Sequence, residues 1–161
     1  MSNKPLYKKY TAWAVAIFIV LFIWGMQDSY GAEVRLGLGK GMTNGNDWIT
    51  QEFMLVGKRK WYLSAMLTGN DDQQPDTWRY AVGYRVNWRD HTRASPFMRL
   101  GAAYWQDKPV PLISDHVSYD MAVGVRVLHV VELEWQHNST SGRSDQNKGN
   151  DLFTLAMVFT F

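Results

Sequence analysis

The chain has 161 residues, no cysteine and a formal net charge of +2 at neutral pH. This length is enough for one domain, and without cysteine neither a disulfide framework nor a thiolate metal site can form. The slight charge gives no general attraction to nucleic acid. The 13 glycines, 8 tryptophans and 8 tyrosines suit strands and interfaces better than a helical bundle.

The first 31 residues differ from the rest of the chain. Three lysines open the chain, an apolar run covers residues 12–26, and small residues follow as far as Gly31. This order is typical of a secretory signal peptide, and the run is shorter than the about 20 residues that span a bilayer. We therefore expect residues 1–31 to be a cleaved signal peptide, with an uncleaved anchor as the alternative. Residues 32–161 would then carry 14 basic and 14 acidic residues, because the leader removes three lysines and Asp28 from totals of 17 and 15.

The mature part consists of short segments in which polar and apolar residues alternate. Successive residues of a strand point to opposite faces, so this alternation predicts strands with one apolar face. The segments are close to the about 9–11 residues that a tilted membrane strand needs. They cover residues 34–42, 48–57, 60–68, 77–88, 95–106, 117–127, 130–139 and 151–161.

The two faces of these segments favour a membrane barrel over a soluble sandwich. Trp78 and Trp88 lie near the two ends of one apolar face, where an interfacial aromatic girdle is expected. The opposite faces carry charges of both signs, which can pair inside the narrow lumen of an eight-stranded barrel. These charges are Arg35, Arg79, Arg85, Arg99, Arg126, Glu52, Asp120, Glu132 and Glu134. Open sheet edges are not tolerated in lipid, so we predict an all-β fold, an eight-stranded antiparallel transmembrane β-barrel of the bacterial outer membrane.

The connections between the segments alternate in kind. Longer polar connections alternate with the short "GKRK", "RDHTRA" and a turn near Leu128–His129. Outer-membrane barrels have short periplasmic turns and longer extracellular loops. The turn near Leu128–His129 contains neither Gly nor Pro, and it is inferred from strand length alone.

His137, Ser139 and Asp151 surround the last polar connection. Counting along the two flanking segments places all three on the apolar, lipid-facing side. With an even number of strands and both termini in the periplasm, this connection is extracellular, so the three residues would lie near the outer headgroups. Polar groups that face lipid are costly unless they lie near the interface or have a function. A serine, a histidine and an acid together suit ester hydrolysis, although strands commonly end in such residues without any catalytic role.

The same residues resemble a known family. A His-x-Ser pair near the end of strand seven, an acidic residue twelve positions after the serine, and "NKGND" before the last strand resemble the lipid A 3-O-deacylases. These are the PagL-type outer-membrane acyloxyacyl hydrolases. The resemblance covers the mature chain in architecture and residues 137–151 in motif. It implies hydrolysis of the ester-linked acyl chain at the 3-position of lipid A in lipopolysaccharide, at the extracellular leaflet, without a metal or other cofactor.

The resemblance assigns roles to the three residues. Ser139 corresponds to the nucleophile, His137 to the base and Asp151 to the acid that orients the base. Two positions depart from the family pattern: Thr140 stands where the family often has asparagine, and Asp151 is one methylene shorter than the usual glutamate. Either departure would loosen the triad or shift the substrate preference.

The polar connection itself carries three further candidates. Asn147 matches an asparagine that the family places near the oxyanion, where a side-chain amide can stabilise the tetrahedral intermediate. Arg143 and Lys148 are candidate contacts for the phosphates of lipid A, with plain solvation as the alternative.

Two other functions stay open. A small structural or adhesive barrel would use its loops for contact and would need no lipid-facing triad. An outer-membrane phospholipase also has His-x-Ser, but that family resembles a twelve-stranded barrel with asparagine and calcium, and residues 32–161 are too few for twelve membrane strands. A homodimer is a further open expectation.

Overall fold

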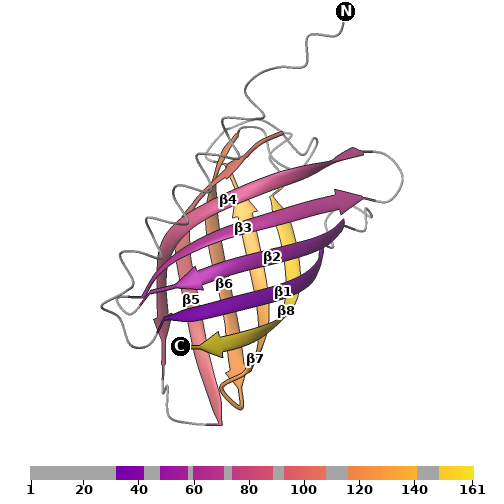
Figure 1. Ribbon diagram of the computed structural model, residues 1–161. Helices are drawn as coiled ribbons and strands as arrows, with labels where there is room; N and C mark the ends of the chain where they lie inside the picture. The colour runs from indigo at the N-terminus through magenta and orange to yellow at the C-terminus, as the bar shows by residue number, and fades with distance from the viewer. Residues whose placement is uncertain are drawn as a thin grey trace, which may run out of the picture. The chain divides into compact units, whose positions relative to one another are not determined.

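The computed structural model describes residues 32–41, 48–57, 60–70, 74–88, 93–107, 116–140 and 149–161. These residues form eight antiparallel strands in sequence order, and the last strand closes the barrel on the first (Figure 1). The strands are β1 Glu33–Gly41, β2 Trp48–Val56, β3 Trp61–Asn70, β4 Gln74–Asn87, β5 Ala94–Trp105, β6 Val117–Val127, β7 Val131–Ser139 and β8 Asn150–Thr160. The predicted fold class is therefore confirmed, whereas the expected signal peptide, residues 1–31, lies outside the described residues. Within the described part of the chain, no helix is long and apolar enough to cross a membrane.

The β3–β4 hairpin is longer than the alternation predicts. Pairing continues beyond Thr68 and Thr77 to Asn70 and Gln74, with a register shift between Thr68 and Asn70. The extra residue of a β-bulge lets a strand continue past an irregular position. The polar composition of this segment suggested a loop, but polar residues pair as strands wherever the hairpin leaves the apolar belt.

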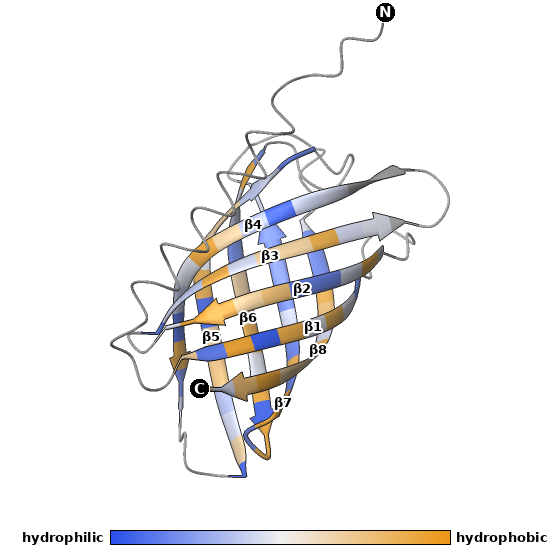
Figure 2. Ribbon diagram, in the orientation of Figure 1, coloured by the Kyte–Doolittle hydropathy of each residue, from blue (hydrophilic) through white to orange (hydrophobic). Residues whose placement is uncertain are grey.

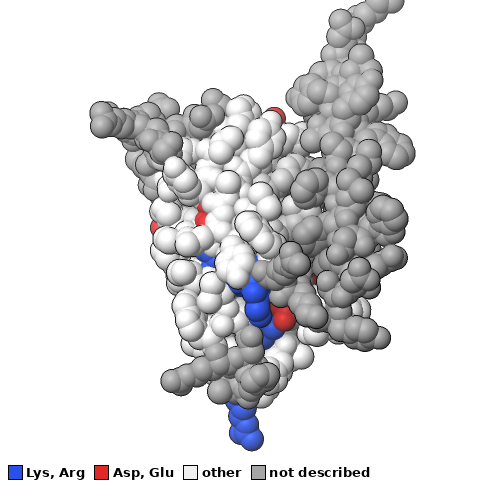
Figure 3. Space-filling model, turned by 90° about the vertical axis from the view of Figure 1, so that its left-hand side faces the viewer, with Lys and Arg blue, Asp and Glu red and all other residues white. Residues whose placement is uncertain are grey.

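The barrel is apolar outside and polar inside, the reverse of a soluble protein. Leu38 is 66% exposed and Tyr119 is 61% exposed on the outer wall, while Arg35 and Arg99 are completely buried inside. Figure 2 shows the corresponding alternation of hydrophobic and hydrophilic residues along the strands. On the face shown in Figure 3, most of the described surface carries no charged side chain. A wall of this kind suits contact with lipid.

The interior charges pair with one another across the lumen, as the sequence predicts. Arg35 contacts Glu52, Glu132 and Glu134; Arg79 contacts Asp120; Arg85 contacts Glu132; Arg99 contacts Glu52 and Glu134; and Arg126 contacts Glu132 and Glu33. Glu33 was not among the predicted partners, and it gives the five arginines a fifth acid. Together with buried aromatic and apolar side chains such as Trp105, Tyr62 and Phe97, these charged side chains fill the inside of the described barrel, as expected for eight strands.

The short turn between β6 and β7 has an unusual backbone. Leu128 and His129 have φ values of 52° and 63°, and the amide of Val130 donates a hydrogen bond to the carbonyl of Val127. Two-residue hairpin turns that follow the twist of the strands need positive φ at both central residues. The sequence signal was weak because neither central residue is the glycine or asparagine that such turns favour.

Leu128→Asn is expected to stabilise the barrel by about 1 kcal/mol, because asparagine tolerates the left-handed conformation that costs other residues about 1–2 kcal/mol. Urea unfolding of the purified protein, followed by gel mobility of the folded and unfolded forms, measures the change. Val130→Asn in the same turn is the matched control, since Val130 is not among the residues with positive φ. Equal effects of the two substitutions would contradict the prediction.

Candidate active site

The three predicted catalytic residues lie at one end of the β7–β8 hairpin. His137 and Ser139 are two of the last three residues of β7, and Asp151 is the second residue of β8. All three are partly exposed, whereas their chain neighbours Asn138 and Asn150 are buried. The side chains therefore belong to the outer, lipid-facing wall, as the alternation along the two segments predicted.

The strand register brings His137 and Asp151 together. They are directly opposite each other in the β7–β8 ladder, and Nδ1 of His137 lies 2.8 Å from Oδ1 of Asp151. A carboxylate only accepts hydrogen bonds, so the N–H group at Nδ1 is the donor, and the neutral form of such a ring has its lone pair on Nε2. An imidazole in this tautomer can take a proton from a neighbouring hydroxyl.

Ser139 shares the face of His137 but is not bonded to it. The two positions are one pleat apart, roughly 7 Å between Cα atoms from a rise of about 3.4 Å per residue. Ser139 pairs with Tyr119 of β6 in the sheet. Among the described residues, no hydrogen bond joins the Ser139 hydroxyl to the His137 ring. The structure thus brings His137 and Asp151 together, and the Ser139 side chain would have to rotate to reach Nε2.

Two further residues, Trp135 and Gly149, border the His137 ring. It stacks on Trp135, with ring centroids 6.0 Å apart and planes inclined by 28°. On its other edge lies the backbone of Gly149, which has a φ of 69°. Trp135 and Asp151 therefore restrict the ring, and Gly149 places no side chain against the edge that carries Cε1 and Nε2.

The inner side of β7 is anchored by a buried polar network. The side-chain amide of Gln136 donates hydrogen bonds to Asp120, at 2.9 Å, and to Asn138, at 3.3 Å. Asp120 also accepts a hydrogen bond of 2.6 Å from the Tyr62 hydroxyl and lies 2.7 Å from the Arg79 guanidinium. Side chains held in this way fix the backbone that carries the outward residues, which a catalytic site requires.

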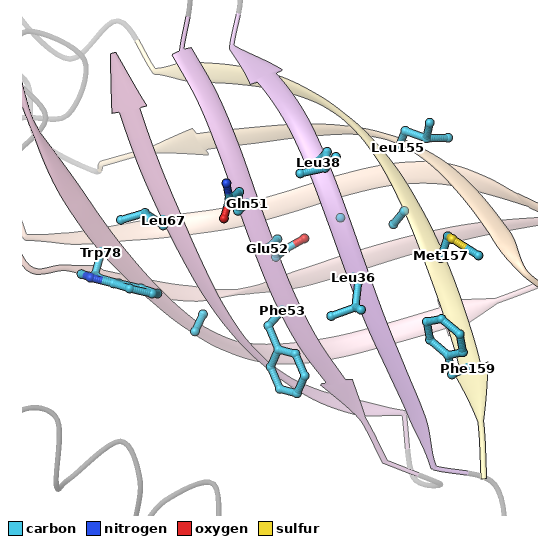
Figure 4. Close-up of a pocket in the computed structure, with 13 residues that line it drawn as sticks. Leu36, Leu38, Gln51, Glu52, Phe53, Leu67, Trp78, Leu155, Met157 and Phe159 are labelled. Atoms are coloured by element: carbon cyan, nitrogen blue, oxygen red, sulfur yellow. The ribbon is translucent and has the colours of Figure 1, made fainter. Parts of the chain in front are cut away.

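An apolar groove begins next to the acid–base pair. It is an open hollow on the outer wall, with a volume of about 470 Å³. Its outward side chains are Lys40, Leu38, Leu133, Trp135, Phe153 and Leu155. Leu38 and Leu155 also line a second groove on the neighbouring wall, where Gln51 lies among apolar side chains such as Leu36, Phe53 and Met157 (Figure 4). The wall below His137 therefore offers a continuous apolar path.

Other predicted site residues fall outside the described part of the chain. Asn147, Arg143 and Lys148 belong to residues 141–148, which the structure does not describe, so their roles stay predictions. Among the described residues, no group of three or more histidine and acidic side chains is arranged to hold a metal ion. Sequence reasoning missed the contacts of Trp135 and Gly149 with the ring. The sequence does place Trp135 on the same face of the strand as His137, two residues before it, and this could have indicated the contact.

Comparison with known proteins shows the fold. No protein-family model and no curated protein sequence matches this chain. The solved structure of the outer membrane enzyme PagL is 10% identical, with a TM-score of 0.56, and the match covers 80% of this chain and 99% of PagL. A de novo designed transmembrane β-barrel is 13% identical, with a TM-score of 0.51, over 84% of this chain and 99% of its own. The designed protein TMB2.3 is 16% identical, with a TM-score of 0.51, over 84% and 98%.

These similarities extend to an enzyme and to designed proteins alike. At such low identity they show that the chain has the fold of an outer-membrane-type eight-stranded barrel, and they do not show membership of the PagL family.

Proposed function

We propose that this chain is an outer-membrane lipid A 3-O-deacylase, a serine hydrolase whose site faces the lipid of the extracellular leaflet. The observation that carries the proposal is the hydrogen bond of 2.8 Å between His137 and Asp151 on the outer wall, with Ser139 on the same face. A structural barrel has no need of an oriented histidine–carboxylate pair in contact with lipid.

The proposed reaction proceeds through an acyl-enzyme. Oγ of Ser139 attacks the carbonyl carbon of the ester while Nε2 of His137 takes the hydroxyl proton, and Asp151 stabilises the resulting imidazolium. The tetrahedral intermediate then breaks its bond to the sugar oxygen, which leaves as a hydroxyl with the proton from His137. Water attacks the acyl-enzyme with His137 again as base, and the fatty acid is released as Ser139 is restored.

The groove beside the site supports a lipid substrate. Its apolar lining extends from Trp135 and Phe153, next to the acid–base pair, toward Leu38 and Leu155. An acyl chain in this groove would exchange contact with membrane lipid for contact with side chains, and its ester would lie at the level of His137. The predicted contacts of Arg143 and Lys148 with lipid A phosphates, and of Asn147 with the oxyanion, belong to this proposal as well.

A non-enzymatic barrel is the second candidate. Within the described part of the chain the Ser139 hydroxyl is not bonded to His137, which favours this candidate, because a histidine and an acid can pair at a strand end without any reaction. A phospholipase activity is a third and weaker candidate, since it would use the same three residues on a different ester.

The test is mass spectrometry of lipid A from cells that express the wild type, Ser139→Ala or Ser64→Ala. Ser64 is a buried serine on the inner face and serves as the matched control. We expect loss of one hydroxyacyl chain from lipid A with the wild type and with Ser64→Ala, and intact lipid A with Ser139→Ala. Heat-dependent gel mobility checks that each protein is folded.

Unchanged lipid A from all three folded proteins would contradict the deacylase and favour the structural barrel. Fatty acid released from phospholipid vesicles, with lipid A unchanged, would instead favour the phospholipase.

A further inference from the structure

Gly149 occupies the space beside the catalytic edge of the His137 ring. A Cβ atom at this position would lie 2.6 Å from Cε1 and 3.1 Å from Nε2 of His137, and 3.3 Å from the carbonyl oxygen of Asn138. The first distance is shorter than any ordinary carbon–carbon contact. Any side chain at residue 149 therefore has to displace the ring or the loop.

The ring has little freedom to give way. Its Nδ1 is bonded to Asp151 on the neighbouring strand, and one face stacks on Trp135. A movement away from residue 149 lengthens the bond to Asp151 or disturbs the stack. Nε2, the atom that has to reach Ser139, lies on the edge that Gly149 leaves open.

We propose that Gly149 is a positioning residue for His137: its missing side chain holds open the place from which Nε2 meets the Ser139 hydroxyl. This inference rests on the proposed hydrolase function and deepens it. It also explains why a glycine stands where the last loop enters β8, directly before Asn150 and Asp151.

A simpler role for Gly149 is to supply its backbone conformation. Its φ of 69° is strained for most side chains. Asparagine separates the two roles, since it tolerates positive φ better than alanine does but carries the same Cβ. If only the backbone conformation mattered, Gly149→Asn would lower turnover much less than Gly149→Ala. If steric contact with the ring matters, both variants lose turnover.

The first experiment measures turnover of lipid A by the purified full-length protein in detergent. We expect both Gly149→Ala and Gly149→Asn to lower kcat by roughly 100-fold, the effect of a misplacement of about 1 Å, with KM unchanged. Gly57→Ala is the control, because among the described residues a Cβ there meets just a carbonyl oxygen of Trp61, at an ordinary 3.7 Å, and it should retain wild-type turnover.

The second experiment is a double-mutant cycle on stability, which does not depend on activity. Urea midpoints are measured for the wild type, Gly149→Ala, His137→Ala and the double variant. Gly149→Ala should lower the midpoint when His137 is present and much less when the ring has been removed. If Gly149→Ala does not fold, recovery of folding in the double variant gives the same support.

The outcomes separate the two proposals. Equal effects of Gly149→Ala on the midpoint in both backgrounds, or an active Gly149→Ala beside an active wild type, would overturn the positioning role alone. A folded wild type without any hydrolytic activity would overturn the proposed function and the catalytic role of Gly149 with it.

Discussion

From the proposed hydrolase mechanism we expect Asp151→Asn to lower the rate of lipid A hydrolysis by about 10⁴-fold, the size of the effect when the acid of a serine-hydrolase triad becomes an amide. The carboxylate accepts a hydrogen bond from the Nδ1–H group of His137. An asparagine amide can instead donate to Nδ1, which places the ring proton on Nε2. In that tautomer Nε2 cannot take the proton of Ser139, although the ring stays in place.

Initial rates on purified lipid A, with protein of verified fold, measure this effect. Asp151 is partly exposed on the outer wall, so the barrel should fold as before. Asp107→Asn is the matched control, because this exposed acid follows β5, a strand that pairs with neither β7 nor β8, and the variant should keep the wild-type rate. A loss of less than tenfold in Asp151→Asn would mean that Asp151 does not orient the base.

The fold could be predicted because lipid imposes a strict alternation on the chain. Each of the eight predicted segments overlaps an observed strand, and their ends differ by at most three residues. The errors lie where that constraint ends. Polar residues are acceptable both in a loop and in a strand that has left the membrane, so the extension of β4 to Gln74 could not be recognised. The turn near Leu128–His129 was predicted correctly, but mainly from strand length, because its two central residues are ones that turns rarely place at positive φ.

The sequence predicts which face of the sheet carries the candidate site residues, but it does not predict which of their side chains touch. Parity assigns His137, Ser139 and Asp151 to one face because the side-chain period of a strand is two. Which residues meet across the hairpin depends on the register, and the bond between His137 and Asp151 needed the three-dimensional ladder. The contact of Gly149 with the ring was further out of reach, since a glycine in a polar loop reads as an ordinary turn residue.

The second large expected effect is the loss of stability when Arg99, inside the barrel lumen, is replaced. Arg99 is completely buried and lies 3.1 Å from Glu52, 2.8 Å from Glu134 and 3.7 Å from Asp120. It also donates a hydrogen bond of 2.8 Å to Gln136, whose neighbours on β7 carry the candidate site. One guanidinium thus compensates three buried acids and supports the backbone behind His137.

Arg99→Met is expected to destabilise the barrel by about 3–5 kcal/mol, because removing one partner leaves buried charges uncompensated. The side chain of methionine is shorter but has a similar volume, so lost packing is a minor part of the change. Urea unfolding in detergent measures the loss, and Arg93→Met, at an exposed arginine before β5, should change the midpoint little. Equal midpoints for the two variants would show that the lumen acids are stabilised without Arg99, by water or by the four remaining arginines. The predicted loss would instead show that the charges inside the barrel, and not only its apolar wall, hold the strands that carry the site.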